Sequence, residues 1–452
     1  MKIIIVGCGK IGTAILSALA KEGYDITAID NKQEIIDRIS NVYDVMTLCG
    51  NGADYEALRE AGVAKADLFV ATTASDELNM LICFLARKLG AKHTVSRIRN
   101  PEYNDKSLDF LKQQFDLSLT LNPELLAAQE IHNVLKFPFA VKIESFTGRN
   151  FELVEIRLQS ESILDGLSLR EMREKYNAGY LICAVQRGEE IFIPSGNFVL
   201  RSGDKIGISA SPQEIQKLVK MLGLHKKQAK SVMILGGGKT TYYLAKKLLA
   251  TGVAVKILEK DPENCRELSA LLPSAIVLNA DGTQNDTLLE EGLLRTDAFV
   301  SLTGMDEENI LSSISVYLQK VPKVIAKINR AEFIDLAGKI GLDTVVSPLD
   351  LTSSILVRYA RALENTEGSN VETLYRLMDG RAEALEFSVG EKAAYTEIPL
   401  KQLKLKSNTL IAGILRARKP IIPSGDDCIL PGDRVVVLTA GRRLQDLSEI
   451  LQ

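Results

Sequence analysis

The sequence contains no tryptophan, and its three histidines, His93, His132 and His225, lie far apart along 452 residues. Dispersed histidines disfavour a histidine-based metal or catalytic site. The six cysteines form no CxxC pair: Cys8, Cys49, Cys83, Cys183, Cys265 and Cys428. Zinc sites use closely spaced ligand pairs, so we interpret these cysteines as reduced residues of a cytosolic protein.

Long apolar runs and an excess of basic charge are also missing. No stretch reaches the ~18–20 apolar residues that cross a bilayer, so we expect no direct membrane insertion. Met1–Gly7 already has the pattern of a strand, and we expect no cleavable signal region. The formal net charge is -3, which disfavours nucleic acid as a partner because nucleic-acid binders usually carry a basic excess.

The chain repeats itself at an offset of 229 residues. The segments IIIVGCG and VMILGGG begin at Ile3 and Val232, Ile-Pro-Ser-Gly occurs at Ile193 and Ile422, and Gly-Asp occurs at Gly203 and Gly432. In the middle of the unit the offset becomes 230. One offset over whole units indicates a duplication.

Each unit has two parts of different character. In the first part, β-branched runs alternate with helical patterns, which predicts a parallel sheet covered by helices on both faces. In the second part, Phe151–Leu158 and Asp204–Ala210 alternate apolar and polar residues, which predicts a half-exposed, mostly antiparallel sheet. We therefore expect an α/β fold with two tandem Rossmann-type doubly wound parallel sheets, each followed by a small α+β lobe.

The boundaries of four domains follow from this division. We place the first Rossmann-type domain at residues 1–121 and the second at 230–350. A connecting helix and small lobe follow each of them, at 122–225 and 351–452, and Lys226–Lys230 is a polar linker.

The first unit carries a glycine-rich loop that follows a strand and opens a helix. It consists of Gly7, Cys8, Gly9, Lys10, Ile11 and Gly12. The first glycine permits a tight turn, the second lets a pyrophosphate approach the backbone, and the third lets helix and strand pack closely. The helix N-terminus supplies N–H groups and positive dipole to phosphate. Asp30, at the end of the second strand, can accept the ribose hydroxyls and disfavours a 2′-phosphate.

Further residues of this site are expected on the loops after the later strands, because ligands lie at the carboxyl ends of parallel strands. These loops hold Asn51, Thr73 with Ala74, and Arg97, which faces phosphate or makes a surface ion pair. Lys10 is unusual inside a glycine loop. It meets a β- or γ-phosphate, which keeps ATP or ADP among the ligands, or it is a solvated surface lysine; both interpretations stay open.

The second copy departs from the fingerprint. It reads Gly236, Gly237, Gly238, Lys239, Thr240 and Thr241, and its acidic residue is Glu259. Thr241 replaces the third glycine and is expected to crowd the contact between helix and strand. The second loop is therefore either an occupied site or a degenerate copy kept for assembly.

An NAD-dependent oxidoreductase is the alternative function. Such an enzyme needs a substrate domain with a proton donor near the nicotinamide, yet the partner lobe is small and offers no histidine. We interpret the Ile-Pro-Ser-Gly segments as strand-turn elements. A stand-alone sensor whose lobes bind a cation or cyclic dinucleotide through acidic residues such as Asp165 and Asp204 is a further interpretation.

The ordered motifs resemble those of the RCK (KTN) family. They are GxGxxG, Asp30, Gly50–Asp54, Ala71–Asn79 and Arg97–Arg99, followed by a lobe with Ile-Pro-Ser-Gly and Gly-Asp. Two such units in one chain resemble the peripheral subunits of Trk-type potassium uptake systems, and the resemblance covers essentially the whole chain.

The resemblance implies a regulatory subunit without enzymatic activity, cytoplasmic and peripheral to the membrane. It implies a homo-oligomer, a tetramer whose eight nucleotide domains form a ring on a membrane-embedded potassium transporter. NAD(H), with ATP or ADP as alternative ligands, are the implied nucleotides. In the first site they would contact Gly7 to Ile11, Asp30, Thr73, Ala74 and Arg97. In the second they would contact Gly236 to Thr240, Glu259, Thr303, Gly304 and Lys327, which stands where the first copy has Arg97.

Overall fold

The computed structural model describes the chain except residues 104, 138–139, 147–150, 160–161, 177–178, 224–227, 343, 366–370, 379, 392–394, 418, 443 and 445. His225 and part of the predicted linker Lys226–Lys230 lie outside the described residues. The chain forms two compact units: unit 1 contains Met1–Leu135 and Ala229–Ala360, and unit 2 contains Lys136–Gln228 and Arg361–Gln452. Within the described residues, no helix is both long and apolar enough to span a membrane.

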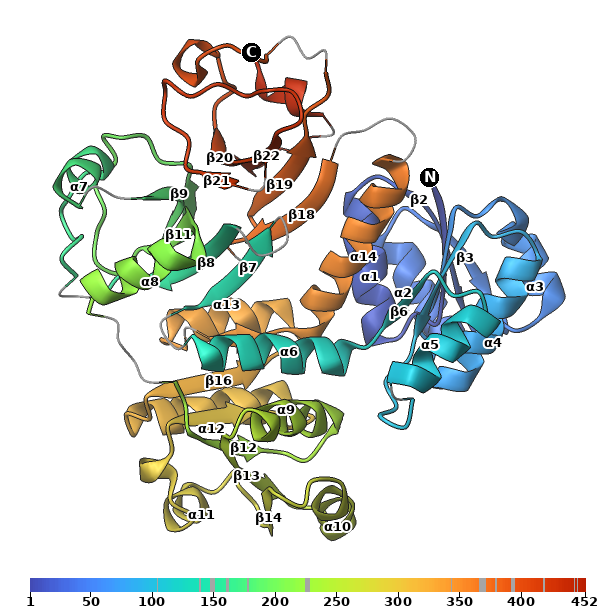
Figure 1. Cartoon of the computed structure of the whole chain (residues 1–452). Coiled ribbons are helices and arrows are strands. Elements are labelled where there is room, and N and C mark those ends of the chain that lie inside the picture. The colour runs from blue at the N-terminus through green and yellow to red at the C-terminus, as the bar shows by residue number, and fades with distance from the viewer. Residues whose placement is uncertain are drawn as a thin grey trace. The chain divides into compact units, whose positions relative to one another are not determined.

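The first sheet of unit 1 has six parallel strands in the order β3-β2-β1-β4-β5-β6, of which β2, β3 and β6 are labelled in Figure 1. Their bounds are β1 Lys2–Val6, β2 Asp25–Asp30, β3 Met46–Cys49, β4 Leu68–Ala71, β5 His93–Arg97 and β6 Leu119–Leu121. The helices are α1 Lys10–Lys21, α2 Gln33–Val42, α3 Tyr55–Glu60, α4 Asp76–Lys88 and α5 Asp105–Gln114. This is the predicted doubly wound order, which reverses between β1 and β4, the place where ligands of this fold usually bind.

The second sheet repeats the first in the order β14-β13-β12-β15-β16-β17. Its strands are β12 Ser231–Leu235, β13 Ala254–Glu259, β14 Ile276–Asn279, β15 Ala298–Ser301, β16 Lys323–Lys327 and β17 Val345–Val346. Its helices are α9 Lys239–Ala250, α10 Pro262–Leu271, α11 Asn285–Glu290, α12 Asp306–Leu318 and α13 Ala331–Lys339. The predicted pair of tandem Rossmann-type sheets is confirmed.

The central strands are apolar on both faces because helices cover both faces of the sheet. In β1, Ile3, Ile4 and Ile5 are fully buried, whereas a strand with one wet face would alternate. Charged residues such as Asp30 and Arg97 lie at the strand ends, where the loops are.

Two connecting helices join the Rossmann-type domains within unit 1. Helix α6, Pro123–Lys136, follows the first sheet, yet its buried Ala127, Ile131 and Val134 belong to the core of the second domain. Helix α14, Pro348–Asn365, follows the second sheet, and its Tyr359 ring packs edge-on against His93 of the first domain. Each domain thus receives a helix from the other copy.

Unit 2 contains two small lobes built on five-stranded antiparallel sheets, β10-β9-β11-β8-β7 and β18-β19-β22-β20-β21. The first lobe contains β7 Lys142–Phe146, β8 Phe151–Arg157, α7 Leu169–Tyr176, β9 Tyr180–Arg187, β10 Glu190–Phe192, β11 Lys205–Ala210 and α8 Pro212–Met221. The second contains β18 Val371–Leu377, β19 Ala382–Ser388, β20 Thr409–Arg416, β21 Lys419–Ile421 and β22 Arg434–Ala440. The two Ile-Pro-Ser-Gly segments follow β10 and β21 directly.

The expectation of a half-exposed sheet in this lobe is wrong. All six residues of β11 are buried, because one face packs in the lobe's own core and the other meets the second lobe. There, Ser209 Oγ donates to Ala412 O at 2.9 Å, and Met378 N donates to Glu155 Oε1 at 2.9 Å. The buried Glu155 also pairs with Lys205 at 3.0 Å.

Candidate functional site

The first glycine loop links the end of β1 to helix α1. Gly7 has φ +85°, and a Cβ at this position would lie 2.7 Å from Thr73 N, so only glycine fits. A Cβ on Gly12 would lie 2.0 Å from Gly7 O, which confirms the close packing that the third glycine permits. The side of Gly9 that a Cβ would occupy is open space. The loop is therefore tight on its protein side and free on its outer side.

Asp30 fixes the conformation of this loop from the end of β2. One carboxylate oxygen accepts from Cys8 N at 2.7 Å and the other from Lys32 N at 3.0 Å. The side chain is only 8% exposed. A carboxylate has about four acceptor positions, so Asp30 retains acceptor capacity for a ribose while it holds the loop.

Asn79 joins the loop after β4 to the end of β5. Its Oδ1 accepts from Thr73 N and Thr73 Oγ1, each at 2.7 Å, and its Nδ2 donates to Arg97 O at 3.0 Å. Arg99 donates to Ala74 O at 2.8 Å. Asn51 Oδ1 accepts from Ala53 N within its own turn. The buried amide of Asn79 thus ties the loop after β4 to the end of β5, with both its oxygen and its nitrogen satisfied.

The second loop has the same geometry with different residues. Gly236 has φ +96°, and Gly237 N donates to Glu259 Oε2 at 2.6 Å. Gly238, like Gly9, faces open space. Asn309 Oδ1 accepts from Thr303 N at 2.8 Å, and its Nδ2 donates to Lys327 O at 2.9 Å. Gly304 and Lys239 are exposed beside the loop.

The crowding expected from Thr241 does not occur. Thr241 is fully buried, and its hydroxyl donates to Gly236 O at 2.6 Å. Thr72, which fills the corresponding space in the first copy, is replaced by Leu302. The helix and the strand are therefore packed by a different pair of side chains.

Both loops lead into helices whose N-termini are suited to anions. The N-cap residues of α1 and α9 are Gly9 and Gly238, so no side chain accepts a hydrogen bond from the first N–H groups of either helix. The first turns of both helices also lack acidic residues. Such helix ends present backbone N–H groups and partial positive charge to a ligand.

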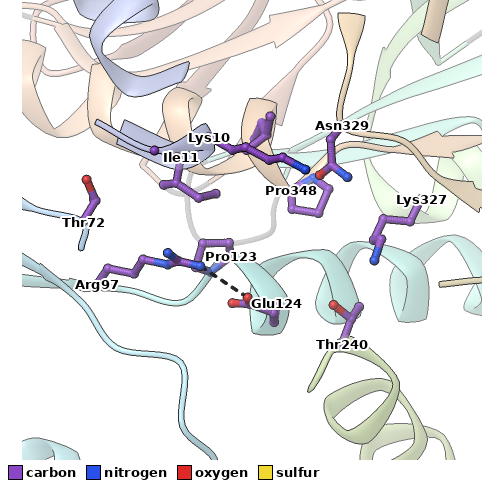
Figure 2. A pocket seen from close by; sticks show the side chains of 12 residues that line it. Lys10, Ile11, Thr72, Arg97, Pro123, Glu124, Thr240, Lys327, Asn329 and Pro348 are labelled. Atoms are coloured by element: carbon purple, nitrogen blue, oxygen red, sulfur yellow. Dashed lines mark ion pairs between the residues drawn. The ribbon is translucent and has the colours of Figure 1, made fainter. Parts of the chain in front are cut away.

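The two loops open onto one cavity of about 310 Å³ inside unit 1. Figure 2 shows Lys10 and Arg97 on one side of it and Thr240 and Lys327 on the other. Its lining residues are Gly9, Lys10, Ile11, Thr72, Arg97, Pro123, Glu124, Thr240, Lys327, Asn329, Pro348 and Leu349. The cavity thus brings together six of the predicted residues from both copies, whereas the sequence suggested two separate sites.

The other predicted residues do not line the cavity. They support the loops behind it or lie farther along the strand ends: Gly7, Cys8, Gly12, Asp30, Asn51, Thr73, Ala74, Gly236, Gly237, Gly238, Lys239, Glu259, Thr303 and Gly304.

The cavity carries an excess of positive charge that is partly removed from water. The Arg97 side chain is 13% exposed and pairs with Glu124 at 3.6 Å. Burial lowers the pKa of both Arg97 and Lys327, and Lys10 also lowers that of Lys327. Three cations face one carboxylate here, so an anion is the ligand that this cavity favours.

Glu124 and Asn329 were not among the predicted residues. Glu124 lies in the first turn of α6, and its Oε2 is buried without a hydrogen-bond partner among the described residues. The rule that ligands lie at carboxyl ends of strands, applied to β6 as well as β5, indicates this position. Asn329 follows β16 and is held by Asp306 at 2.9 Å.

The acidic residues considered as cation ligands in the small lobe are engaged by protein donors. Asp204 accepts from both Arg187 Nε and Arg187 Nη2, at 2.8 and 2.7 Å, and Asp165 accepts from Ser202 N at 2.8 Å. No group of three or more His, Cys, Asp or Glu residues suited to a metal occurs in the described part of the chain.

Two family models match the chain twice each. The TrkA-N domain matches residues 3–112 and 232–348, and the TrkA-C domain matches residues 153–223 and 384–452. Each matched segment lies within one of the four predicted domains, whose boundaries remain predictions.

Two curated relatives extend over the full chain. The Trk system potassium uptake protein TrkA homolog 1 of Methanosarcina mazei is 31% identical and covers 99% of each chain. The Trk system potassium uptake protein TrkA of Haemophilus influenzae is 30% identical and covers 100% of this chain and 99% of its own.

Solved structures share the fold at low identity. The GsuK RCK domain aligns with a TM-score of 0.63 and 16% identity over 97% of this chain and 92% of its own. The GsuK channel bound to NAD aligns with a TM-score of 0.62 and 16% identity over 97% and 77%. With both family models and full-length relatives in agreement, the chain belongs to the TrkA family of Trk system potassium uptake proteins.

Proposed function

We propose that this chain is a nucleotide-binding regulatory subunit that gates a membrane-embedded potassium transporter of the Trk type. The observation that carries the proposal is the shared cavity, on which two glycine loops and the cations Lys10, Arg97 and Lys327 converge. Uncapped helix N-termini, the partly buried cations Arg97 and Lys327 and the exposed Lys10 are arranged for phosphate groups. The names of the full-length relatives support potassium uptake as the process.

The proposed ligands are NAD(H) and, alternatively, ATP or ADP. The similar GsuK channel has been solved bound to NAD and also bound to ADP. In our proposal Asp30 and Glu259 accept the ribose hydroxyls, and the phosphates lie over Gly9 and Gly238 toward the cavity. Thr73, Ala74, Asn51, Thr303 and Gly304 complete the two sites.

We infer that the function is regulation without chemical turnover. No histidine lines the cavity among the described residues, and a hydride-transferring enzyme would need a proton donor beside its substrate. The NAD-dependent oxidoreductase remains the alternative, and a substrate-dependent loss of reduced nicotinamide absorbance would support it.

The proposed mechanism is a population shift. A ligand favours one conformation only through its differential affinity for the two. We propose that four chains assemble into a ring on the cytoplasmic face of the transporter, as a peripheral homo-tetramer. Nucleotides between the paired domains of unit 1 then favour one ring conformation, and this conformation sets the gate.

Calorimetric titration with NAD+, NADH, ATP and ADP tests this function. We expect saturable binding to the wild-type protein. Asp30→Ala removes a charged acceptor from the first site, and losing such a bond costs about 1.5–3 kcal/mol, or roughly 10–100-fold in affinity. Asp25→Ala is the matched control, because Asp25 is an exposed aspartate at the opposite end of the same strand.

Two results would contradict the proposal. If none of the four nucleotides binds the wild-type protein, the chain is not a nucleotide sensor. If Asp30→Ala and Asp25→Ala behave alike, the first glycine loop is not the binding site.

A further inference from the structure

The two glycine loops hold their backbone carbonyls with different side chains. In the first loop, Gly7 O accepts from Thr72 Oγ1 at 2.7 Å, and Cys8 O accepts from Thr13 Oγ1 at 2.8 Å. Thr72 comes from the end of β4, and Thr13 comes from the first turn of α1. Both carbonyls of the tight turn are therefore satisfied by threonine hydroxyls.

The repeat has lost both of these hydroxyls at the equivalent positions in the second copy. Leu302 stands where the first copy has Thr72, and Tyr242 stands where it has Thr13. If the second loop were a relic of the duplication, the carbonyls of Gly236 and Gly237 would be left without their side-chain donors.

Two other residues supply the missing donors. Thr241, at the position of Gly12, donates to Gly236 O at 2.6 Å, and Asn264, at the position of Ile35, donates through Nδ2 to Gly237 O at 3.1 Å. Neither replacement stands at a position that makes such a bond in the first copy, where Gly12 and Ile35 are found. The same two carbonyls are thus supported in both loops from four non-equivalent positions.

The exchange is sterically reciprocal. In the first copy a Cβ on Gly12 would lie 2.0 Å from Gly7 O and 2.8 Å from Thr72 Oγ1. The Thr72 hydroxyl can therefore reach Gly7 O only because residue 12 is glycine. In the second copy Leu302 carries no hydroxyl, and the fully buried Thr241 supplies the donor to the same carbonyl. A Cβ on Gly237 would lie 2.7 Å from Leu268 Cδ1, 2.8 Å from Glu259 Oε2 and 2.9 Å from Asn264 Nδ2, so a side chain at this position, such as Cys8 in the first copy, would displace these groups.

The backbone conformation of such a glycine turn sets the direction of the N–H groups that follow it, and side-chain donors to its carbonyls help to fix that conformation. Leaving a buried carbonyl without a donor is costly. We propose that Thr241 and Asn264 are the positioning residues of the second loop, which hold its turn in the conformation that binds the adenosine diphosphate moiety of a nucleotide. The proposal rests on the proposed function, because it concerns the same class of ligand.

Titration with ADP tests the second loop, since ADP is the moiety that NAD and ATP share. The parent protein is Asp30→Ala, in which the first site is weakened and the second is read separately. We expect Thr241→Val to lower ADP affinity about tenfold, as loss of one buried hydrogen bond would, and Asn264→Leu to do the same. Thr241→Ser retains the hydroxyl and stays within about twofold of the parent.

The double variant Thr241→Gly, Leu302→Thr recreates the arrangement of the first loop, and we expect it to recover the parent affinity. A purely structural loss would not be rescued by moving the hydroxyl. Thr251→Val is the matched control, because Thr251 donates to Leu248 O at the other end of helix α9. Circular dichroism of each variant shows that it is folded, and Asn264→Leu provides an independent test if Thr241→Val is not.

Three outcomes are decisive. ADP binding by Thr241→Val and Asn264→Leu equal to the parent would overturn the positioning role. Binding by the wild-type protein that disappears completely in Asp30→Ala would show the second loop to be empty, while the proposed function stands. Absence of ADP, ATP and NAD binding in the wild-type protein would remove the proposed function itself.

Discussion

At the scale of single residues, the charged side chains of Lys327 and Arg97 are unfavourably buried in the cavity, and an anionic ligand would stabilise them. Lys327 lies 3.3 Å from Leu302 O, and burial lowers its pKa from the ordinary 10.5. Arg97 is in a similar position on the opposite side and is only partly compensated by Glu124 at 3.6 Å. Groups with such shifts commonly mark functional sites.

Replacing Lys327 by methionine should change the stability of the protein and its affinity for ATP in opposite directions. We expect Lys327→Met to raise the melting temperature of the unliganded protein at neutral pH, because a desolvated charge is removed. ATP affinity should fall about tenfold, since a charged donor to phosphate is lost. Differential scanning calorimetry and titration measure the two effects.

The pH dependence follows from the same shift. The unfolded chain holds the Lys327 proton to higher pH than the folded protein does, so stability rises with pH between the lowered pKa and 10.5. The gain from Lys327→Met should therefore shrink as the pH rises through that interval. Lys323→Met, at the other end of β16, serves as the control. A methionine variant that is less stable at neutral pH would contradict the prediction.

At the scale of elements, helix α9 connects the second loop to the first domain. Tyr243 on α9 donates to Arg99 O at 2.9 Å and accepts from Asn122 Nδ2 at 3.1 Å. Arg99 follows the strand that ends in Arg97, and Asn122 precedes the helix that carries Glu124. The first turns of α9, which follow the second glycine loop, are thus hydrogen-bonded to segments of the first domain that carry Arg97 and Glu124.

Tyr243→Phe removes only these two bonds. We expect it to lower the free energy of unfolding by about 1–2 kcal/mol, the usual value for one or two buried hydrogen bonds. Urea denaturation followed by circular dichroism measures the change, and Tyr242→Phe on the adjacent residue is the control. Equal stability of the two phenylalanine variants would show that the bridge contributes nothing.

The elements also show how far sequence reasoning reaches. Strand order, both glycine loops and the acids Asp30 and Glu259 follow from local patterns, because strand-loop-helix motifs are encoded within a few neighbouring residues. Local patterns do not predict that β11 is buried on both faces. Nor do they predict the place of Glu124 or the exchange of α6 and α14. They depend on which surfaces meet after folding, and residues distant in sequence decide that. Thr241 belongs to this group. From the glycine pattern alone it predicts crowding, whereas in the structure, where Leu302 replaces Thr72, its hydroxyl donates to Gly236 O.

At the scale of the whole molecule, the exchanged helices make the two copies depend on each other. The face of α6 with Ala127, Ile131 and Val134 is at most 1% exposed and is covered by the second domain. A chain that ends after the first copy would leave this face in water, and burying such surface is worth about 25 cal/mol per Å².

We therefore expect a fragment of residues 1–136, which lacks the small lobes, to dimerise by exchanging α6 between two molecules. Each α6 would occupy on its partner the place that α14 takes beside His93 in the full chain. Light scattering after size-exclusion chromatography measures the mass. Ile131→Asp in the fragment should prevent dimerisation, and a fragment that is monomeric without this change would contradict the prediction.

The bridge made by Tyr243 has a consequence for how such proteins evolve. The residue at the equivalent position of the first copy is Ala14, so the contact exists on one side only. In a symmetric dimer of identical chains every contact must occur twice, and a substitution good on one side and harmful on the other is rejected. Gene fusion lifts that constraint, so each half is free to acquire its own sequence and, with it, its own affinity for the same metabolite.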